Sequence, residues 1–340
     1  MIDAHVHCRD CKQSSKETIE HALDVAKDSG LSAIFDMPNT DPTATTKKEI
    51  KKRLSLAKKA NSPVFYGIHI GITSDKEQIK EAVETWKEYF PHVVGLKMFA
   101  GKSVGNLEII KEEKQFEVYR ELASLKYKGV LVVHCEKEAH INNKLWNPSK
   151  PSSHDDARPE KSEIESVKDQ IRFASDANYE GRLHIAHVSV PESVDIICNS
   201  KNKLRISCGA TPHHLLLDTS SIDNLRNGFL YKVNPPIRKP ETRKKLLEYF
   251  LDCKIDILES DHAPHNYKEK FSSHLSGIPN LASWPQFIKL LKKEGMENDM
   301  LEMVAFENVN MIYNTRIKKL KLPVKNRTAE YVFSPYSNLK

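Results

Sequence analysis

The sequence lacks the features that mark a membrane or secreted protein. Its longest apolar runs are only as long as a β-strand, whereas a membrane-spanning helix needs about 20 apolar residues. The N-terminus has no basic region followed by an apolar stretch, so we expect no signal peptide. The six cysteines are scattered without the spacing of a disulfide framework. Together these absences predict a cytoplasmic protein with reduced thiols.

Two further absences narrow the function. The sequence has no stripe of basic and aromatic residues, and the lysines behind its net charge of +6 concentrate in helix-like stretches, so nucleic acid is not an expected partner. No glycine-rich turn follows the first apolar run, although an open dinucleotide-binding sheet would require one. The mildly basic balance is instead compatible with an anionic small-molecule substrate.

Short apolar runs and amphipathic helical patterns alternate along most of the 340 residues. Alternation of this kind predicts a parallel sheet with helical crossovers, and eight strands predict its closure into a (β/α)8 TIM-type barrel. The expected strands are 2–7, 31–36, 63–70, 93–98, 130–135, 182–188, 204–209 and 255–260. The expected helices are 16–29, 46–60, 75–89, 113–127, 162–178, 191–200, 240–252, 282–293 and 299–312.

The same pattern predicts the domain organisation. We expect residues 1–315 to form a single barrel that starts at once, without a preceding domain and with little or no accessory β-sandwich. Residues 316–340 are expected to be a basic C-terminal tail. Two long polar insertions, 142–163 and 266–280, follow the fifth and eighth expected strands. Active-site loops of a barrel lie after strand C-termini, so these insertions are expected near the site.

The first expected strand carries a His-x-His motif, His5-Val6-His7, followed closely by Arg9. Alternate residues of a strand point to the same side, so both imidazoles could hold one cation. The motif alone is weak, because two ordinary histidines would look the same. Other strand ends strengthen it: Lys97, His134, His187 and Asp261 close the fourth, fifth, sixth and eighth runs. The carboxyl ends of the strands form the catalytic face of a barrel.

Four histidines, one aspartate and one buried lysine are the ingredients of a binuclear metal site. A lone buried ammonium is costly and tends to lose its proton. The neutral amine of Lys97 could then take up carbon dioxide and form a carbamate that bridges two cations. A salt-bridged or snorkelling lysine, or a substrate ligand, remains the alternative for this position.

The motifs together resemble those of dihydroorotase, a cyclic amidohydrolase of the amidohydrolase superfamily. They occur in order between residues 3 and about 285. The motifs are His5-Val6-His7-Cys8-Arg9-Asp10, Asp36-Met37-Pro38-Asn39-Thr40, Gly95-Leu96-Lys97, His134-Cys135-Glu136, His187-Val188-Ser189, Asn234-Pro235-Pro236-Ile237-Arg238 and Asp261-His262-Ala263-Pro264-His265. Each motif is weak by itself, whereas seven in order with barrel spacing are specific.

The resemblance implies two zinc ions and a reaction. His5, His7 and Asp261 would hold one zinc, and His134 and His187 the other. Lys97, N6-carboxylated, would lie between the ions together with a bridging hydroxide. Asp261 would also act as the general acid and base. The implied reaction is the reversible cyclisation of N-carbamoyl-L-aspartate to (S)-dihydroorotate in pyrimidine biosynthesis.

The resemblance also implies substrate contacts and partners. Arg9, Asn39 and His265 match positions that bind the substrate carboxylate. Asn234 resembles a further substrate contact, and Ser276-Gly277 resembles a loop that offers backbone groups to the ring. The family habit is a homodimer, and an association with aspartate transcarbamoylase is compatible with it. No membrane partner is expected.

Two departures and two alternatives accompany this interpretation. Asp10-Cys11-Lys12 stands where the family often shows Asp-Pro-Gly, and the substrate loop beginning at Gly277 deviates as well. Another cyclic-amide hydrolase (a hydantoinase, dihydropyrimidinase or allantoinase) is the first alternative, which Arg9 together with Asn39 disfavours. An inactive scaffold for aspartate transcarbamoylase is the second, which the intact ligand set disfavours.

Several other polar residues are expected to have ordinary roles. His69 and His154 are predicted to be surface or loop residues. Arg238 is expected either to assist the substrate site or to form a surface salt bridge.

Overall fold

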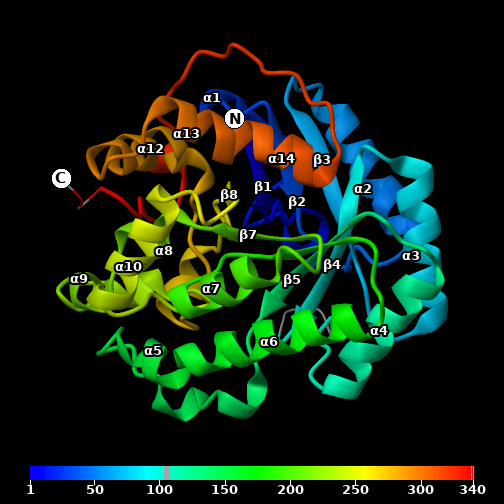
Figure 1. The fold of residues 1–340 in the computed structure, drawn as a ribbon. Helices are drawn as coiled ribbons and strands as arrows, with labels where there is room; N and C mark the ends of the chain where they lie inside the picture. Colours follow the sequence, from blue (N-terminus) through cyan, green and yellow to red (C-terminus); the bar gives the residue numbers. More distant parts are fainter. Residues whose placement is uncertain (103–106, 338, 340) are drawn as a thin grey trace.

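The computed structural model describes residues 1–102, 107–337 and 339. In this part of the chain, eight parallel strands form one sheet in sequence order. They are β1 (Ile2–Val6), β2 (Ala33–Asp36), β3 (Phe65–Gly71), β4 (Val93–Ala100), β5 (Val130–Cys135), β6 (Arg182–Ile185), β7 (Ile206–Ala210) and β8 (Ile257–Leu258). Beyond β8 the chain returns to β1, where the His7 N–H donates to the carbonyl of His262 at 2.8 Å. The predicted barrel is therefore confirmed (Figure 1).

Helices cross over between the strands and surround the barrel (Figure 1). The main ones are α1 (Ile19–Asp28), α2 (Lys47–Ala60), α3 (Lys76–Tyr89), α4 (Glu112–Ser124), α6 (Glu160–Asp176), α7 (Pro191–Ser200) and α10 (Pro240–Leu251). Polar N-caps begin several of them: the side chains of Thr18, Thr46 and Asp75 each accept a backbone N–H three residues on. The strands and these helices lie where the hydrophobic pattern predicts them.

The remaining helices, most of them short, occupy the loops and the end of the chain. They are α5 (Ser153–Ala157), α8 (Pro212–Leu216), α9 (Thr219–Asp223), α11 (Tyr267–Phe271), α12 (Trp284–Lys293), α13 (Asn298–Glu302) and α14 (Asn308–Tyr313), with a π-helical turn at Met303–Glu307 before α14. α5 lies in the insertion after β5 and α11 in the insertion after β8. Among the described helices, none is both long and apolar enough to cross a membrane.

The barrel interior changes from apolar to polar along its axis. At its N-terminal end, Ile2, Phe35 and Val94 pack with Val309 and Ile312 of α14 in one hydrophobic cluster. Tyr313 lies edge-on to Phe35, with 5.0 Å between ring centroids. α14 thus closes this end of the barrel, and the polar residues of the site gather toward the other.

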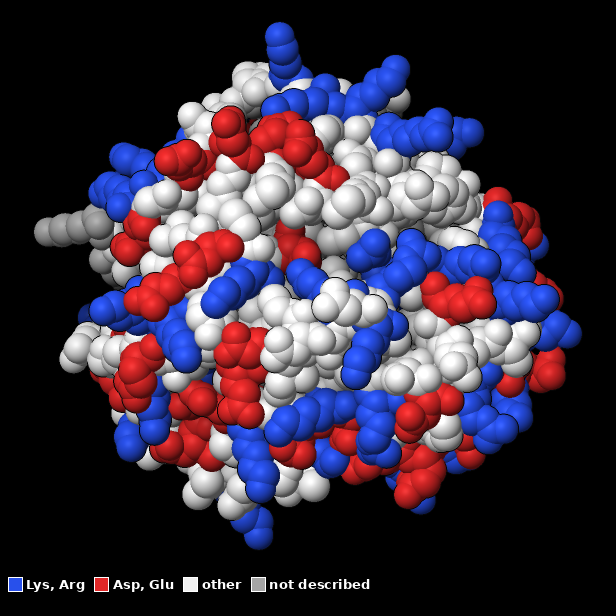
Figure 2. Space-filling model, viewed as in Figure 1, with Lys and Arg blue, Asp and Glu red and all other residues white. Residues whose placement is uncertain are grey.

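The tail after α14 folds back onto the barrel, and its red trace in Figure 1 crosses toward α12. The Tyr331 hydroxyl donates to Glu17 at 2.9 Å, and the Tyr336 hydroxyl donates to the side-chain oxygen of Asn280 at 2.9 Å. Residues 338 and 340 of the predicted tail lie outside the described part. On the face seen in Figure 2, basic and acidic side chains are interspersed rather than gathered by sign.

Candidate active site

A pocket of about 360 Å³ lies at the carboxyl ends of the strands. The structure brings all the predicted site residues except Lys97 to its lining. These are His5, His7, Arg9, Asn39, His134, His187, Asn234, Asp261, His265, Ser276 and Gly277. Three lysines that the sequence argument did not single out, Lys16, Lys102 and Lys232, also line it. With Arg9, they place four basic side chains around the pocket, of which Lys16 is paired with Glu269 at 2.6 Å.

The His-x-His motif converges on the aspartate after β8. Nε2 of His5 lies 3.4 Å, and Nε2 of His7 3.1 Å, from Oδ1 of Asp261. One ligand atom from each of these buried residues lies within 4.8 Å of the other two. A register shift between β1 and β2, between Asp3 and Val6, lies at the same place in the strand. The three residues have the composition and spacing of one metal half-site.

His134 and His187 form the adjoining half. Nδ1 of His134 lies 3.2 Å from Nε2 of His187. The ring centroids of His187 and His5 are 5.1 Å apart, so the two halves share a boundary. Lys97 of β4 is fully buried beneath the pocket, and its Nζ has no hydrogen-bond partner among the described residues. Burial lowers the pKa of Lys97 to about 8, so the neutral amine forms more readily than in an exposed lysine.

The electrostatics of the site suit a cation. Burial lowers the pKa values of His5, His7 and His187 well below the usual histidine range. Neutral imidazoles keep a lone pair for a metal. Burial also raises the pKa of Asp261 to about 7, against the opposing effect of Lys97. Without a cation, this cluster therefore holds an aspartate that is costly to ionise.

Three residues at the site adopt left-handed backbone conformations although none is glycine. The φ angles are 52° for Arg9, 40° for His187 and 46° for Asp261. Such conformations cost about 1–3 kcal/mol each and cluster at functional sites. Each residue lies just beyond a strand, where the turn determines the direction of its side chain. Strand periodicity could not reveal these turns.

Two carboxylates behind the histidines were missed by the sequence argument. Oε1 of Glu259 accepts the backbone N–H of His187 at 2.6 Å, and its Oε2 lies 3.6 Å from Nδ1 of His5. Oε2 of Glu136 lies 3.0 Å from Nε2 of His134. Their spacing in the sequence could have revealed them. Each glutamate is two residues from a predicted metal ligand, and alternate residues of a strand lie on the same face. Carboxylates of this kind orient metal-binding imidazoles.

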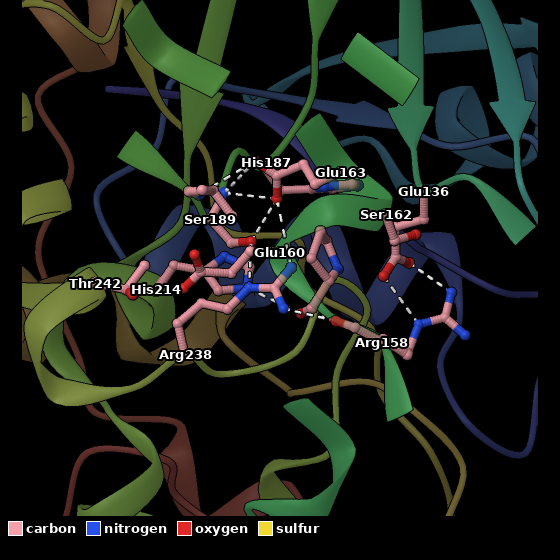
Figure 3. A network of polar contacts seen from close by, with 12 residues as sticks. Glu136, Arg158, Glu160, Ser162, Glu163, His187, Ser189, His214, Arg238 and Thr242 are labelled. Carbon is pink, nitrogen blue, oxygen red and sulfur yellow. Dashed lines mark hydrogen bonds and ion pairs between the residues drawn. The ribbon is translucent and has the colours of Figure 1, made fainter. Parts of the chain in front are cut away.

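Glu136 is itself held by a buried arginine. Arg158 donates from Nε and Nη2 to the two carboxylate oxygens at 2.9 and 2.6 Å (Figure 3). Although burial opposes it, the guanidinium holds the pKa of Glu136 well below its usual range, with a further contribution from His134. Arg158 directly follows α5. The insertion after β5 is therefore connected to the predicted metal ligand His134 through the side chains of Arg158 and Glu136.

Buried groups hold the backbone and side chain of Arg9 at the edge of the pocket. Nη1 of Arg53 donates to the carbonyl of Arg9 at 2.9 Å, and Arg53 pairs with buried Asp36 at 2.5 Å. The Arg9 side chain donates from Nε to the carbonyl of Pro264 at 3.2 Å. Oδ1 of Asn39 is buried without a hydrogen-bond partner among the described residues. Arg9 and Asn39 therefore line one pocket, in which the open oxygen of Asn39 is a hydrogen-bond acceptor.

His265 differs from the other predicted substrate contacts. Its Nε2 lies 3.0 Å from the carbonyl of Ser276, and its Nδ1 lies 3.2 Å from a carboxylate oxygen of Glu269. Both ring nitrogens thus face protein acceptors. Burial, with Arg9 nearby, lowers the pKa of His265 to about 3, and a neutral ring donates to only one of the two. In this conformation His265 links Glu269 to the Ser276 loop at the lining of the pocket, and its predicted contact with the substrate stays a prediction.

Two expectations about the remaining polar residues were wrong, and one of the two alternatives for a third, Arg238, is excluded. His69 is fully buried in the barrel and His154 is 5% exposed, so neither is a surface residue. Arg238 is 2% exposed and forms no surface salt bridge. It donates to Asp155 at 2.7 Å and to the Ser189 hydroxyl at 2.9 Å, a contact that Figure 3 shows. The partners lie 83 and 49 positions away in sequence, and local pattern does not show such contacts.

Known proteins give a consistent picture. No family model matches the chain. A dihydroorotase of Methanothermobacter thermautotrophicus is 31% identical over 327 residues, which cover 94% of this chain and 70% of that protein. An L-hydantoinase (dihydropyrimidinase) from Arthrobacter aurescens shares the fold, with a TM-score of 0.82, 23% identity, and coverage of 92% of this chain and 70% of that one.

A Saccharomyces cerevisiae dihydroorotase, solved in complex with 5-fluoroorotic acid, also shares the fold. Its TM-score is 0.75 at 17% identity, covering 94% of this chain and 85% of that one. Against eight curated dihydroorotases at 29% to 33% identity, the chain spans 59% to 74% of the relative's length. By its similarity to these proteins, the chain belongs to the dihydroorotase family.

Proposed function

We propose that this protein is a metal-dependent cyclic amidohydrolase that interconverts N-carbamoyl-L-aspartate and (S)-dihydroorotate. The observation that carries the proposal is the shared pocket of Asp261, the four histidines and Arg9. A metal-ligand cluster and a guanidinium within one cavity suit a substrate that has both a cleavable amide and a carboxylate. Membership of the dihydroorotase family supports the same reaction.

The residues present fit two divalent cations, which we propose to be zinc. His5, His7 and Asp261 would hold one ion, and His134 with His187 the other. Lys97 would hold both after its neutral amine adds to carbon dioxide and loses a proton to become a carbamate. The buried, unpartnered Nζ of Lys97 supports this assignment. Two such cations acidify water and polarise a carbonyl.

Asp261 is proposed to move the proton. Its carboxylate lies between the two histidines of β1, with Oδ1 3.1 Å from His7 and 3.4 Å from His5. In hydrolysis it would take a proton from the attacking water and give it to the departing ring nitrogen. In cyclisation it would take the proton from the carbamoyl nitrogen and give it to the departing water. One residue at one position thus serves both directions.

Arg9 and Asn39 are proposed to bind the substrate carboxylate, Asn39 through the N–H of its amide, with Lys232 and Lys102 adding positive charge around it; Lys16 is paired with Glu269 at 2.6 Å. A neutral cyclic amide has no group for these cations, so they favour dihydroorotate over hydantoin or dihydrouracil. The hydantoinase neighbour is 23% identical, and that likeness supports the fold alone. The complete ligand set likewise favours an enzyme over an inactive scaffold.

The test is metal content together with activity. Purified protein loaded with zinc should contain two ions per chain and hydrolyse dihydroorotate, and removing zinc with a chelator should abolish turnover reversibly. Asp261→Ala should lose at least about 1,000-fold in kcat, because it removes a ligand and the proton carrier together. An unchanged rate in this variant would overturn the assigned role.

A further inference from the structure

His154 lies outside the pocket, directly behind one of its lining residues, Asn234. It belongs to α5 in the insertion after β5 and is almost fully buried. Its Nε2 lies 2.9 Å from Oδ1 of Asn234 and 3.1 Å from the carbonyl oxygen of Val233. A residue with no access to substrate therefore contacts the side chain of one that has it.

These two contacts determine which ring nitrogen carries the proton. A backbone carbonyl can only accept a hydrogen bond, so Nε2 of His154 must be the protonated nitrogen. The atom of Asn234 that faces this N–H must then be an acceptor, which is Oδ1 and not the amide nitrogen. The Ser276 hydroxyl also donates to Oδ1, at 3.2 Å. Two donors thus satisfy the oxygen of Asn234.

The amide nitrogen of Asn234 is left for the pocket. Among the described residues, no protein group accepts a hydrogen bond from Nδ2, and Asn234 lines the cavity. A flipped amide would place Nδ2 against the N–H of His154, donor against donor, and would leave Oδ1 without its two partners. Loss of a buried hydrogen bond of this kind costs about 1–3 kcal/mol.

The setting of His154 keeps its ring in this state. Its backbone N–H donates to the carbonyl of Pro151, and its carbonyl accepts the N–H of Arg158, both at 3.1 Å. Trp146 covers the ring edge-on, with 5.2 Å between centroids. Nδ1 is buried without a partner among the described residues, and burial lowers the pKa of His154 to about 3. The ring is therefore neutral with one tautomer.

We infer that His154 is a positioning residue that makes Asn234 a hydrogen-bond donor toward the substrate. The group of the substrate at this point must then be an oxygen acceptor, either a ring carbonyl or a carboxylate. A ligand with an N–H or amino group there would place its own donor against the Nδ2 donor of Asn234. This inference rests on the proposed function for the identity of the substrate, and it adds a selectivity for acceptors that the cations alone do not provide.

The test compares His154→Phe with His154→Gln. Phenylalanine keeps a flat ring but has no donor, whereas glutamine restores an N–H. For dihydroorotate we expect His154→Phe to raise KM about tenfold with kcat within about twofold, and His154→Gln to recover most of the loss. His140→Phe, at a partly exposed histidine in the preceding turn, is the matched control and should leave both constants unchanged. Zinc content and the unfolding midpoint verify that each variant is intact.

Two outcomes would overturn the inference: a wild-type KM in folded His154→Phe, or no recovery with glutamine. Nitrogen NMR of histidine-labelled wild-type protein provides a test that does not need the phenylalanine variant to fold. The His154 signals, identified by their loss in His154→Gln, should show the Nε2-protonated neutral ring, and a proton on Nδ1 would contradict it. Absence of dihydroorotate turnover by the wild type would instead refute the proposed function and the substrate assignment with it, separately from the tautomer.

Discussion

The carboxylate of Glu136 lies 3.0 Å from Nε2 of His134, which leaves Nδ1 of that ring facing Nε2 of His187 at 3.2 Å. The glutamate thereby determines which nitrogen His134 offers to a metal. Arg158 in turn holds the glutamate at 2.6 Å. A metal half-site that depends on this arrangement should weaken when the carboxylate is replaced.

Glu136→Gln should reduce zinc affinity at the His134 and His187 half by about 10- to 100-fold, because the amide cannot accept the imidazole N–H as strongly while it also faces Arg158. Competition with a chelator of known affinity measures this. Glu163→Gln is the control: Glu163 is a buried carboxylate of the same network that accepts from Ser189 and Val190. It should lose stability but keep both zinc affinities. Equal zinc binding by Glu136→Gln and wild type would contradict the role.

Arg9→Lys should lower kcat/KM for dihydroorotate by about 10- to 100-fold, because lysine cannot form the two parallel hydrogen bonds of a guanidinium with a carboxylate. Steady-state kinetics measure the change. Lys12→Met is the matched control, since it removes a cation whose side chain is 74% exposed in the same loop. That variant should keep wild-type kinetics. A comparable loss of kcat/KM in Lys12→Met would mean that any nearby positive charge has this effect, and would contradict a specific contact between Arg9 and the carboxylate.

Lys97→Met should make the metal-free protein more stable while abolishing dihydroorotate turnover. The buried Nζ of Lys97 has no hydrogen-bond partner among the described residues, and removing such a group relieves a cost of about 1–3 kcal/mol. Denaturant unfolding of the metal-free forms measures the gain. Lys270→Met is the matched control, because that buried lysine donates to the carbonyls of Leu275 and Gly277. Lys270→Met should be less stable than the wild type. If both variants lost the same unfolding free energy, the interpretation of Lys97 as an unpartnered buried amine would be contradicted.

His21 should make stability fall as the solution becomes alkaline. The His21 ring donates hydrogen bonds to the carboxylates of Glu17 and Glu330, and these bonds, opposed by partial burial, raise the pKa of His21 from 6.5 to about 9. The folded chain therefore holds a proton that the unfolded chain releases, so the contribution is complete below pH 6.5 and is lost as pH rises to about 9. Unfolding midpoints across this range should fall for wild type and less so for His21→Asn. Parallel profiles would rule out this linkage.

The barrel was predictable because a periodic pattern encodes it, and the same pattern brings the proposed metal ligands to one end of the strands. Each strand is a short apolar run, and His134 and His187 each follow such a run directly. Glu136 was within reach of the same reasoning, since it shares a strand face with His134. His154 was not, because its partner Asn234 is 80 residues away and only the folded insertion brings them together. The left-handed turns at Arg9 and Asp261 depend equally on tertiary context.

The central claim is that this pocket is built for a carboxylated cyclic amide, and the most direct test is a substrate comparison with the zinc-loaded protein. Hydrolysis of dihydroorotate, hydantoin, dihydrouracil and allantoin should be measured under one set of conditions, with cyclisation of N-carbamoyl-L-aspartate as the reverse reaction. Dihydroorotate is expected to have the highest kcat/KM by at least about 100-fold, consistent with the loss of a charged contact in the others. A preference for any of the three neutral amides would contradict the account.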